Sequence, residues 1–162
     1  MNTKGGNALV QIDKWKFVEL IEVHKSGMYR LAVSILRNST EAEDAVGEAI
    51  IKAYEKLDKL KDADKFKAWI MQIVVHEAQN IYRTKKHFQY VEDLELTGAS
   101  YQDEHLELLE LVLELPEEFR SVVVLFYYEG FSQKEIAGIL QTPEGTVKSR
   151  LFRARKILQE KL

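Results

Sequence analysis

Apolar residues recur at helical spacing through most of this 162-residue chain. The first such stripe has intervals of three and four residues, which place its side chains on one face of an α-helix. Its members are Phe17, Leu20, Ile21, His24, Met28, Leu31, Ala32 and Ile35. Arg37-Asn38-Ser39 interrupts the pattern. We therefore predict a helix over residues 14–36, preceded by a loose terminus over residues 1–12.

Two more helices are predicted in the N-terminal half. Thr40 and Glu43 have the spacing of a capping box, which predicts a helix from Glu41 to about Leu57. Its expected inward residues are Ala45, Ile50, Ala53 and Leu57. A polar connection over residues 59–65 follows. The third helix is expected from Phe66 to about Lys86, where apolar side chains again recur at helical spacing.

The C-terminal half begins after a segment, residues 92–102, that contains Thr97-Gly98-Ala99-Ser100 and is typical of a flexible linker. A helix starting near Asp103 should end at Leu115-Pro116, and another should span residues 117–128. Residues 122–128 are β-branched or aromatic and favour a strand on propensity alone, but their flanks favour a helix. The predicted fold is therefore all-α, with two small helical domains joined by an acidic linker.

The last thirty or so residues, from Gly130 onward, have the sequence form of a helix-turn-helix. Ser132 and Glu135 form a capping box for a short helix with an apolar face. Thr142 suits the N-cap of the next helix and Pro143 its first position. Gly145 permits close backbone approach, either to the first helix or to a phosphate. In the second helix the expected core-facing residues are Val147, Leu151, Ala154 and Leu158.

The opposite face of that second helix is basic. It carries Lys148, Ser149, Phe152, Arg153 and Lys156, and residues 146–162 have a local charge of +5. An ordinary amphipathic helix often has such a solvated basic face. Here the cap, the turn and the preceding helix favour contact with the major groove of DNA.

The charge layout fits a DNA-binding protein although the net charge is −3. Residues 1–90 carry +3, residues 91–119 carry −10, and residues 120–162 carry +4. The acidic stretch is either a solvated linker with a solvated helix face, or a spacer that avoids DNA and keeps the two basic blocks independent.

Several function classes are disfavoured by the sequence. The chain has no cysteine, so it has no disulfide framework, thiolate zinc site or cysteine nucleophile. His76-Glu77-Ala78-Gln79-Asn80 fails as a zinc protease motif because position 80 is not histidine. We find no glycine-rich phosphate loop and no plausible catalytic triad, and we expect no enzyme activity, cofactor or metal. The apolar runs are too short to span a membrane and no secretory signal opens the chain, so we expect a cytoplasmic protein.

Six strings together resemble one family, the extracytoplasmic-function (ECF) group of bacterial RNA polymerase sigma factors. In the N-terminal half they are Tyr29-Arg30-Leu31-Ala32 with Ile35-Leu36-Arg37-Asn38, Ala42-Glu43-Asp44-Ala45-Val46 and Phe66-Lys67-Ala68-Trp69-Ile70. In the C-terminal half they are Leu115-Pro116-Glu117-Glu118-Phe119-Arg120 and Gly145-Thr146-Val147-Lys148-Ser149-Arg150-Leu151. The resemblance covers nearly the whole chain and implies a promoter-specificity subunit.

The resemblance implies a role for each half. Residues 13–90 would bind core RNA polymerase and the downstream (−10) promoter element, residues 91–103 would be the linker, and residues 104–162 would bind the upstream (−35) element. The polymerase clamp would meet Asp44 and Glu48. Gly47 departs from the glutamine usual in the family, and costs about 1 kcal/mol of helix stability relative to alanine. Ile50 stands where phenylalanine is usual.

The resemblance also implies the DNA contacts. The downstream element would be held by Trp69, His76, Asn80, Arg83, Lys85 and Lys86, and the upstream element by Thr146, Lys148, Ser149, Phe152 and Arg153. Aromatic and amide side chains suit an unstacked base, and arginine binds guanine bidentately. His76 replaces the usual asparagine, so base preference should differ. Core packing is an alternative role for the Trp69 ring.

Two other functions compete with this interpretation. A ligand-responsive transcription factor would use the first half for sensing or dimerisation and would bind its operator alone. A helical adaptor would take partner helices in apolar grooves, but it leaves the charge layout unexplained. The resemblance further implies an anti-sigma factor, often membrane-anchored, as a partner that masks both halves. With no cysteine in this chain, any thiol-based redox sensing would reside in that partner.

Overall fold

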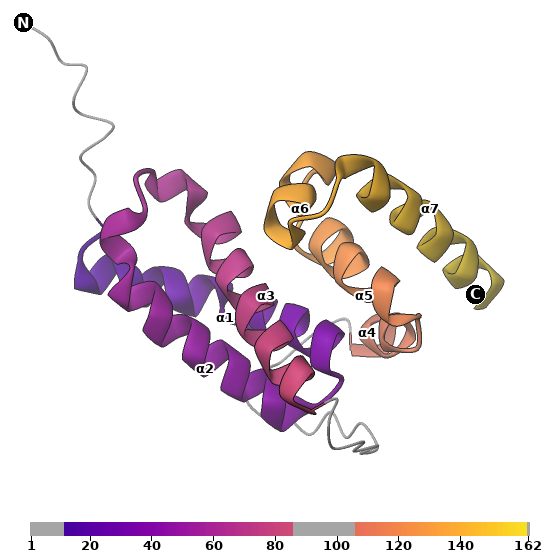
Figure 1. The fold of residues 1–162 in the computed structure, drawn as a ribbon, viewed down its shortest axis with the longest axis horizontal. Coiled ribbons are helices and arrows are strands. Elements are labelled where there is room, and N and C mark those ends of the chain that lie inside the picture. Colours follow the sequence, from indigo (N-terminus) through magenta and orange to yellow (C-terminus); the bar gives the residue numbers. More distant parts are fainter. Residues whose placement is uncertain (1–11, 86–105, 162) are drawn as a thin grey trace, which may run out of the picture.

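The computed structural model describes residues 12–85 and 106–161, and its regular elements in these ranges are all helical. The first range forms the N-terminal unit, which consists of α1 (Lys14–Leu36), α2 (Ser39–Glu55), the short 3₁₀ turns η1 (Leu57–Lys59) and η2 (Ala63–Lys65), and α3 (Phe66–Lys85). The second range forms the C-terminal unit, with α4 (Leu106–Leu113), α5 (Glu117–Val123), η3 (Val124–Tyr128), α6 (Gln133–Leu140) and α7 (Glu144–Lys161). Figure 1 shows the two units side by side. The predicted all-α fold is confirmed.

The N-terminal unit is a bundle in which α1, α2 and α3 all contact one another. Its centre contains fully buried side chains from α1 and α3, such as Leu31, Phe66 and Ile70. Small residues of α2, including Ala42, Ala45 and Ala49, are also fully buried and let the helices approach closely. The sequence pattern predicted Ala45 and Ala53 as inward but missed Ala42, Val46 and Ala49, and it placed Ile50 and Leu57 deeper than they lie.

The ends of the first two helices show one confirmed and one wrong prediction. Helix α1 ends at Leu36 as expected, and Arg37 adopts a left-handed conformation (φ 52°) whose N–H donates to Val33 O. Helix α2 begins two residues earlier than expected. Its N-cap is Asn38, whose side-chain oxygen accepts from the Glu41 N–H at 2.9 Å. The expected capping box of Thr40 and Glu43 is therefore wrong, because asparagine caps a helix as well as threonine does.

The β-branched run at residues 122–128 is helical, as its flanks predicted. It lies in α5 and then in η3, which is a π-helix. The wider turn is visible in the hydrogen bond from Glu129 N to Val124 O, five residues back. Gly130, with φ +74°, then turns the chain away toward α6.

Helices α6 and α7 form the predicted helix-turn-helix. The capping box is present, since Ser132 Oγ accepts from Glu135 N at 3.1 Å and Glu135 Oε1 accepts from Ser132 N at 3.0 Å. These hydrogen bonds lower the pKa of the Glu135 carboxyl. The expected Thr142 cap is absent from the described hydrogen bonds, among which the Thr142 hydroxyl donates to Leu140 O at 3.1 Å. A Cβ added to Gly145 would meet no atom within 4 Å, so this glycine does not serve close approach to α6.

The two units pack against each other, with α6 on α3 and with α5 and η3 on α1. Buried residues from both units belong to one continuous apolar cluster. Because the two units pack together, the two basic blocks are not independent in this structure. The hypothesis that the acidic stretch keeps them independent is therefore wrong. The expected linker, residues 1–11 of the loose terminus expected over residues 1–12, and Lys86 lie outside the described residues. Among the described helices, none combines the length and apolar character needed to cross a membrane.

Candidate nucleic-acid interface

Helix α7 divides sharply into an inner and an outer face. Val147, Leu151 and Ala154 are fully buried against α5 and α6, as their spacing predicted. On the outer face Lys148, Ser149, Phe152 and Arg153 are all exposed. Phe152 is 56 % exposed, an unusual position for a large aromatic side chain. This outer face therefore presents two cations, a hydroxyl and an aromatic ring to solvent.

Contacts within α7 arrange these side chains. The Lys156 ammonium lies 4.9 Å from the centroid of the Phe152 ring and adds a further positive charge to the outer face. Ser149 Oγ donates to Thr146 O at 3.0 Å, and Thr146 itself is only partly exposed. Arg155 points elsewhere, since its Nε donates to the hydroxyl of Tyr127 in η3. The basic face of α7 thus excludes Arg155, which fixes the helix to its own unit.

The predicted downstream-element residues of α3 share one face of that helix. The intervals from Trp69 to His76, Asn80 and Arg83 are seven, four and three residues, which keep them within one stripe. His76 and Arg83 are exposed, whereas Trp69 and Asn80 are partly buried. The Trp69 ring lies 5.9 Å from the fully buried Phe66 ring, so it also packs on the core. Lys85 is the last residue of α3, and its side chain lies outside the description, like Lys86.

A cavity of about 350 Å³ lies beside this stripe of α3, between the two units. Trp69 and His76 line one side, and Ile139, Leu140 and Gln141 at the end of α6 line another. Lys52 and Lys56 of α2 also line it and supply positive charge. Sequence reasoning missed the presence of α6 here, because the apolar side chains of a helix do not indicate which distant element they meet.

His76 and its neighbour Glu77 have opposite environments. Glu77 is buried and accepts a hydrogen bond from Lys52 Nζ at 2.5 Å, which raises the pKa of Lys52. His76 is exposed and faces the cavity. The carboxylate therefore ties α3 to α2, while the imidazole remains accessible.

The predicted polymerase contacts lie on α2. Asp44 and Glu48 are both exposed and are one helical turn apart. Ile51 follows on the same face and is 55 % exposed, so an apolar side chain accompanies the two carboxylates. Sequence reasoning missed Ile51, although a hydrophobic residue one turn beyond two acids of the same face is a detectable signal.

Two family models match the chain. The model "Sigma-70 region 2" matches residues 20–88, and the model "Sigma-70, region 4" matches residues 105–158. The ECF RNA polymerase sigma factor SigW of Bacillus subtilis is 32 % identical over 93 % of this chain and 90 % of its own. This chain belongs to the ECF sigma factors. The resemblance that the sequence motifs indicated is confirmed.

Other relatives agree with this membership. RNA polymerase sigma factor SigV of Bacillus subtilis is 31 % identical and covers 94 % of both chains. In the solved structures, the sigma factor RpoE in complex with the anti-sigma factor NepR from Bartonella quintana matches with a TM-score of 0.74 and 26 % identity, over 89 % of this chain and 94 % of that one. The present chain, as a sigma factor, directs core RNA polymerase to promoters and initiates transcription there.

Proposed function

We propose that this sigma factor holds the upstream promoter element with α7 and the unpaired downstream strand with α3. The observation that carries the proposal is the outer face of α7, where Lys148, Ser149, Phe152 and Arg153 are exposed together. Arg153 would bind guanine, and Phe152 would contact a thymine methyl or a sugar. Thr146 and the backbone at Gly145 would meet phosphate, which the open space around Gly145 permits.

The downstream strand would lie along α3. Trp69 offers part of an aromatic surface for an unstacked base, and His76 and Asn80 offer hydrogen-bonding groups for its edge. Imidazole carries its donor and acceptor on separate ring nitrogens, so it reads a base edge differently from an amide. Arg83, Lys85 and Lys86 would neutralise phosphates as the strand passes the C-terminal end of the helix.

Core RNA polymerase would bind the exposed face of α2. Asp44 and Glu48 would pair with basic side chains and set the rate and register of association. Ile51 would supply the apolar contact that ion pairs at an interface rim do not provide. The domain limits that follow are residues 13–90 for polymerase and downstream contacts, 91–103 for the linker and 104–162 for upstream contacts.

An anti-sigma factor is the proposed regulator, and we expect it to be anchored in the membrane. The support comes from relatives of similar fold. One was solved with the anti-sigma factor NepR, and another, CnrH, was solved with the cytosolic domain of CnrY, with a TM-score of 0.65 and 26 % identity over 91 % of this chain and 88 % of that one. The proposed location is the cytoplasm, where the polymerase acts, and the proposed role is non-enzymatic.

In vitro transcription tests the proposal. Core polymerase alone should not initiate from a library of promoter fragments, and adding this chain should produce defined transcripts. A double variant, Asp44→Lys with Glu48→Lys, should lose initiation while keeping its helical circular dichroism. A ligand-responsive transcription factor would bind DNA without polymerase and would be indifferent to this charge reversal. Initiation that is unchanged by the added chain would refute the proposed function.

A further inference from the structure

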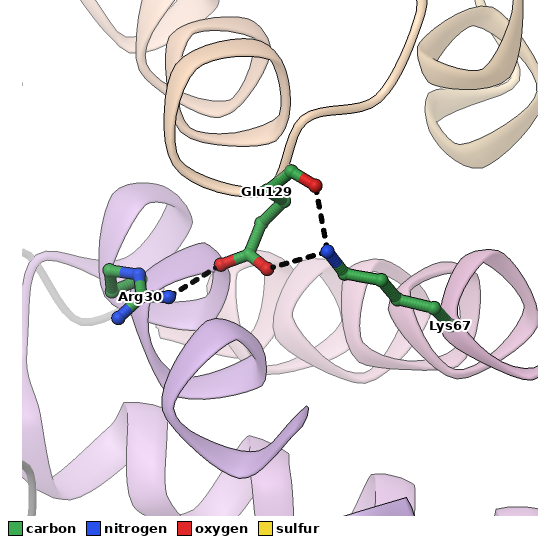
Figure 2. Close-up of polar contacts among 3 residues, drawn as sticks. All are labelled: Arg30, Lys67 and Glu129. Carbon is green, nitrogen blue, oxygen red and sulfur yellow. Dashed lines mark hydrogen bonds and ion pairs between the residues drawn. The ribbon is translucent and has the colours of Figure 1, made fainter. Parts of the chain in front are cut away.

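One buried carboxylate lies in the contact between the two units. Glu129 follows η3 in the C-terminal unit, and its side chain is only 6 % exposed. Its Oε1 accepts a hydrogen bond from Arg30 Nη2 of α1 at 2.7 Å. Its Oε2 lies 3.3 Å from Lys67 Nζ of α3, which also donates to the Glu129 carbonyl at 2.7 Å. Figure 2 shows the carboxylate between the two cations.

The surroundings of this carboxylate are shaped to admit it. A side chain added at Gly27 would place its Cβ 2.5 Å from both Glu129 carboxylate oxygens, so only glycine leaves room for them. Aromatic rings of the C-terminal unit complete the enclosure. Arg30 lies 5.3 Å from the Tyr128 ring centroid, and Lys67 lies 5.0 Å from that of Phe131. Two helices of one unit and the η3–α6 connection of the other are thus joined at a single point.

The contacts of Glu129 with Arg30 and Lys67 should form together and break together. A buried carboxylate is stable only while its cations and donors are in place, because desolvation of an unpaired charge is strongly unfavourable. Removing the carboxylate would also leave Arg30 and Lys67 beneath the C-terminal unit without their shared anion. Separation of the units would return all three groups to water. Glu129 therefore ties its unit to both α1 and α3 through charge pairing.

Closure affects the proposed downstream reader. The end of α6 faces Trp69 and His76 across the cavity, so a DNA strand on this face of α3 would meet the C-terminal unit. The upstream reader is not covered, since the outer side chains of α7 are exposed. In the closed arrangement the proposed upstream contacts on α7 are available to DNA, and the proposed downstream contacts on α3 are obstructed.

Promoter geometry also requires the units to separate. The two elements are about 25 base pairs apart by their names, or about 85 Å at about 3.4 Å per base pair. Helices α3 and α7 have 20 and 18 residues, so they are about 30 and 27 Å long. Because the units touch at Glu129, these two helices cannot reach both elements of one straight duplex without moving apart.

We propose that the Glu129 contact is an autoinhibitory latch that holds the free sigma factor closed and withholds the α3 face from DNA. The latch, defined by Glu129, Arg30, Lys67 and Gly27, must open before both promoter elements are bound. The proposal rests on the proposed role of α3 as downstream reader. Its conformational part is independent of that role and is tested separately.

Two variants open the latch by different means. Glu129→Gln removes the charge, and Gly27→Ala fills the space that the carboxylate needs. The second change places a better helix former in α1, so it should not unfold that helix. Glu110→Gln removes a carboxylate from an exposed position of α4 and is the matched control. Circular dichroism should show the same helix content for all four proteins.

Opening is measured by energy transfer between dyes on cysteines introduced at Asp58 and Gln159, two exposed positions in different units of a chain that has no cysteine of its own. We expect both latch variants to change the transfer efficiency relative to the wild type and the control. Binding of a mixed-sequence single strand of about 20 nucleotides should tighten about tenfold or more, because the competent state becomes the major one.

Each result decides a different claim. Unchanged energy transfer in both latch variants would overturn the latch. Changed energy transfer with unchanged, measurable strand affinity would overturn its inhibitory role. If the transfer changes and no form binds the strand even when saturated with core polymerase, the proposed role of α3 fails while the closing role of Glu129 stands.

Discussion

Helices α3 and α7 each carry a stripe of proposed DNA contacts, but the fold treats the two stripes differently. The stripe of α7 is exposed along its length, and that of α3 shares a cavity with the end of α6. Both helices bury one face and carry basic residues near the other, so local sequence does not explain the difference. It arises from how the units pack, and Glu129 makes ion pairs across that packing to both α1 and α3.

The comparison separates two properties that a promoter reader needs. The first is a face with suitable chemistry, which is a matter of helical periodicity and is present in both helices. The second is access to that face, which depends on the partner unit. In the proposed mechanism, the sigma factor keeps its proposed upstream contacts on α7 exposed while the packing of the units controls access to the proposed downstream contacts on α3.

Adjacent residues of α7 provide the strongest test of its two faces. Leu151 is fully buried and Phe152 is exposed. Leu151→Ala should lower the free energy of unfolding by about 2–5 kcal/mol through lost burial and a cavity. Phe152→Ala should change it by no more than about 0.5 kcal/mol. Urea denaturation followed by circular dichroism measures both values. Similar losses in the two variants would mean that the division of α7 into faces is wrong.

The base-reading role of α7 is tested at Arg153. Arg153→Ala should weaken promoter binding by the polymerase holoenzyme by about 1–3 kcal/mol and relax the preference at one base of the upstream element. Lys156→Ala removes a charge from the same exposed face and is the control. It should weaken binding to all promoters alike. Gel-shift titrations against single-base variants of the element give both results. Equal loss on every variant for Arg153→Ala would exclude base reading by this residue.

Much of the fold follows from the sequence because helical periodicity is a local property. The limits of α1 and the buried and exposed faces of α7 follow from residue spacing alone. The start of α2 does not, because Asn38, Ser39 and Thr40 are all good caps and only the three-dimensional hydrogen bond selects Asn38. The strand-like run in α5 and η3 shows tertiary packing overriding propensity.

The latch lies beyond what sequence reasoning reaches. Arg30 and Glu129 are 99 positions apart, and nothing in either segment identifies the other as its partner. Gly27 lies inside a helix, where glycine is ordinarily unfavourable, and this was the one local sign of a close approach. The position of α6 across a cavity from Trp69 and His76 was equally hidden, since it depends on the same packing of the two units.

Two helical glycines, Gly47 in α2 and Gly27 in α1, allow a matched comparison of an open helix position with one that lies against the latch. A side chain added at Gly47 meets nothing within 4 Å, whereas one at Gly27 meets the Glu129 carboxylate. Gly47→Ala should therefore stabilise the protein by about 1 kcal/mol. Gly27→Ala should show a smaller gain or a loss, because its helix preference is offset by the disturbed carboxylate. Thermal unfolding monitored by circular dichroism compares the two. An equal gain at both positions would argue against close packing at Gly27.

The smallest expected effect concerns the response of the N-terminal unit to acid. His24 stacks on Phe66 at 6.0 Å, and its pKa is lowered by burial and then by Lys67, with Glu129 acting in the opposite direction. The unfolded chain therefore takes up this proton at a higher pH than the folded one. The contribution of neutral His24 to stability is present above about pH 6.5 and is lost as the pH falls through the lowered pKa of the folded state. His24→Gln should reduce the loss of stability between about pH 7 and pH 5, measured by urea denaturation. Residues 106–161 contain no histidine, so the signals of Tyr127 and Tyr128 in η3 should report a smaller acid response than those of tyrosines in the N-terminal unit. A wild-type acid response identical to that of His24→Gln would show that this imidazole does not couple the latch region to pH.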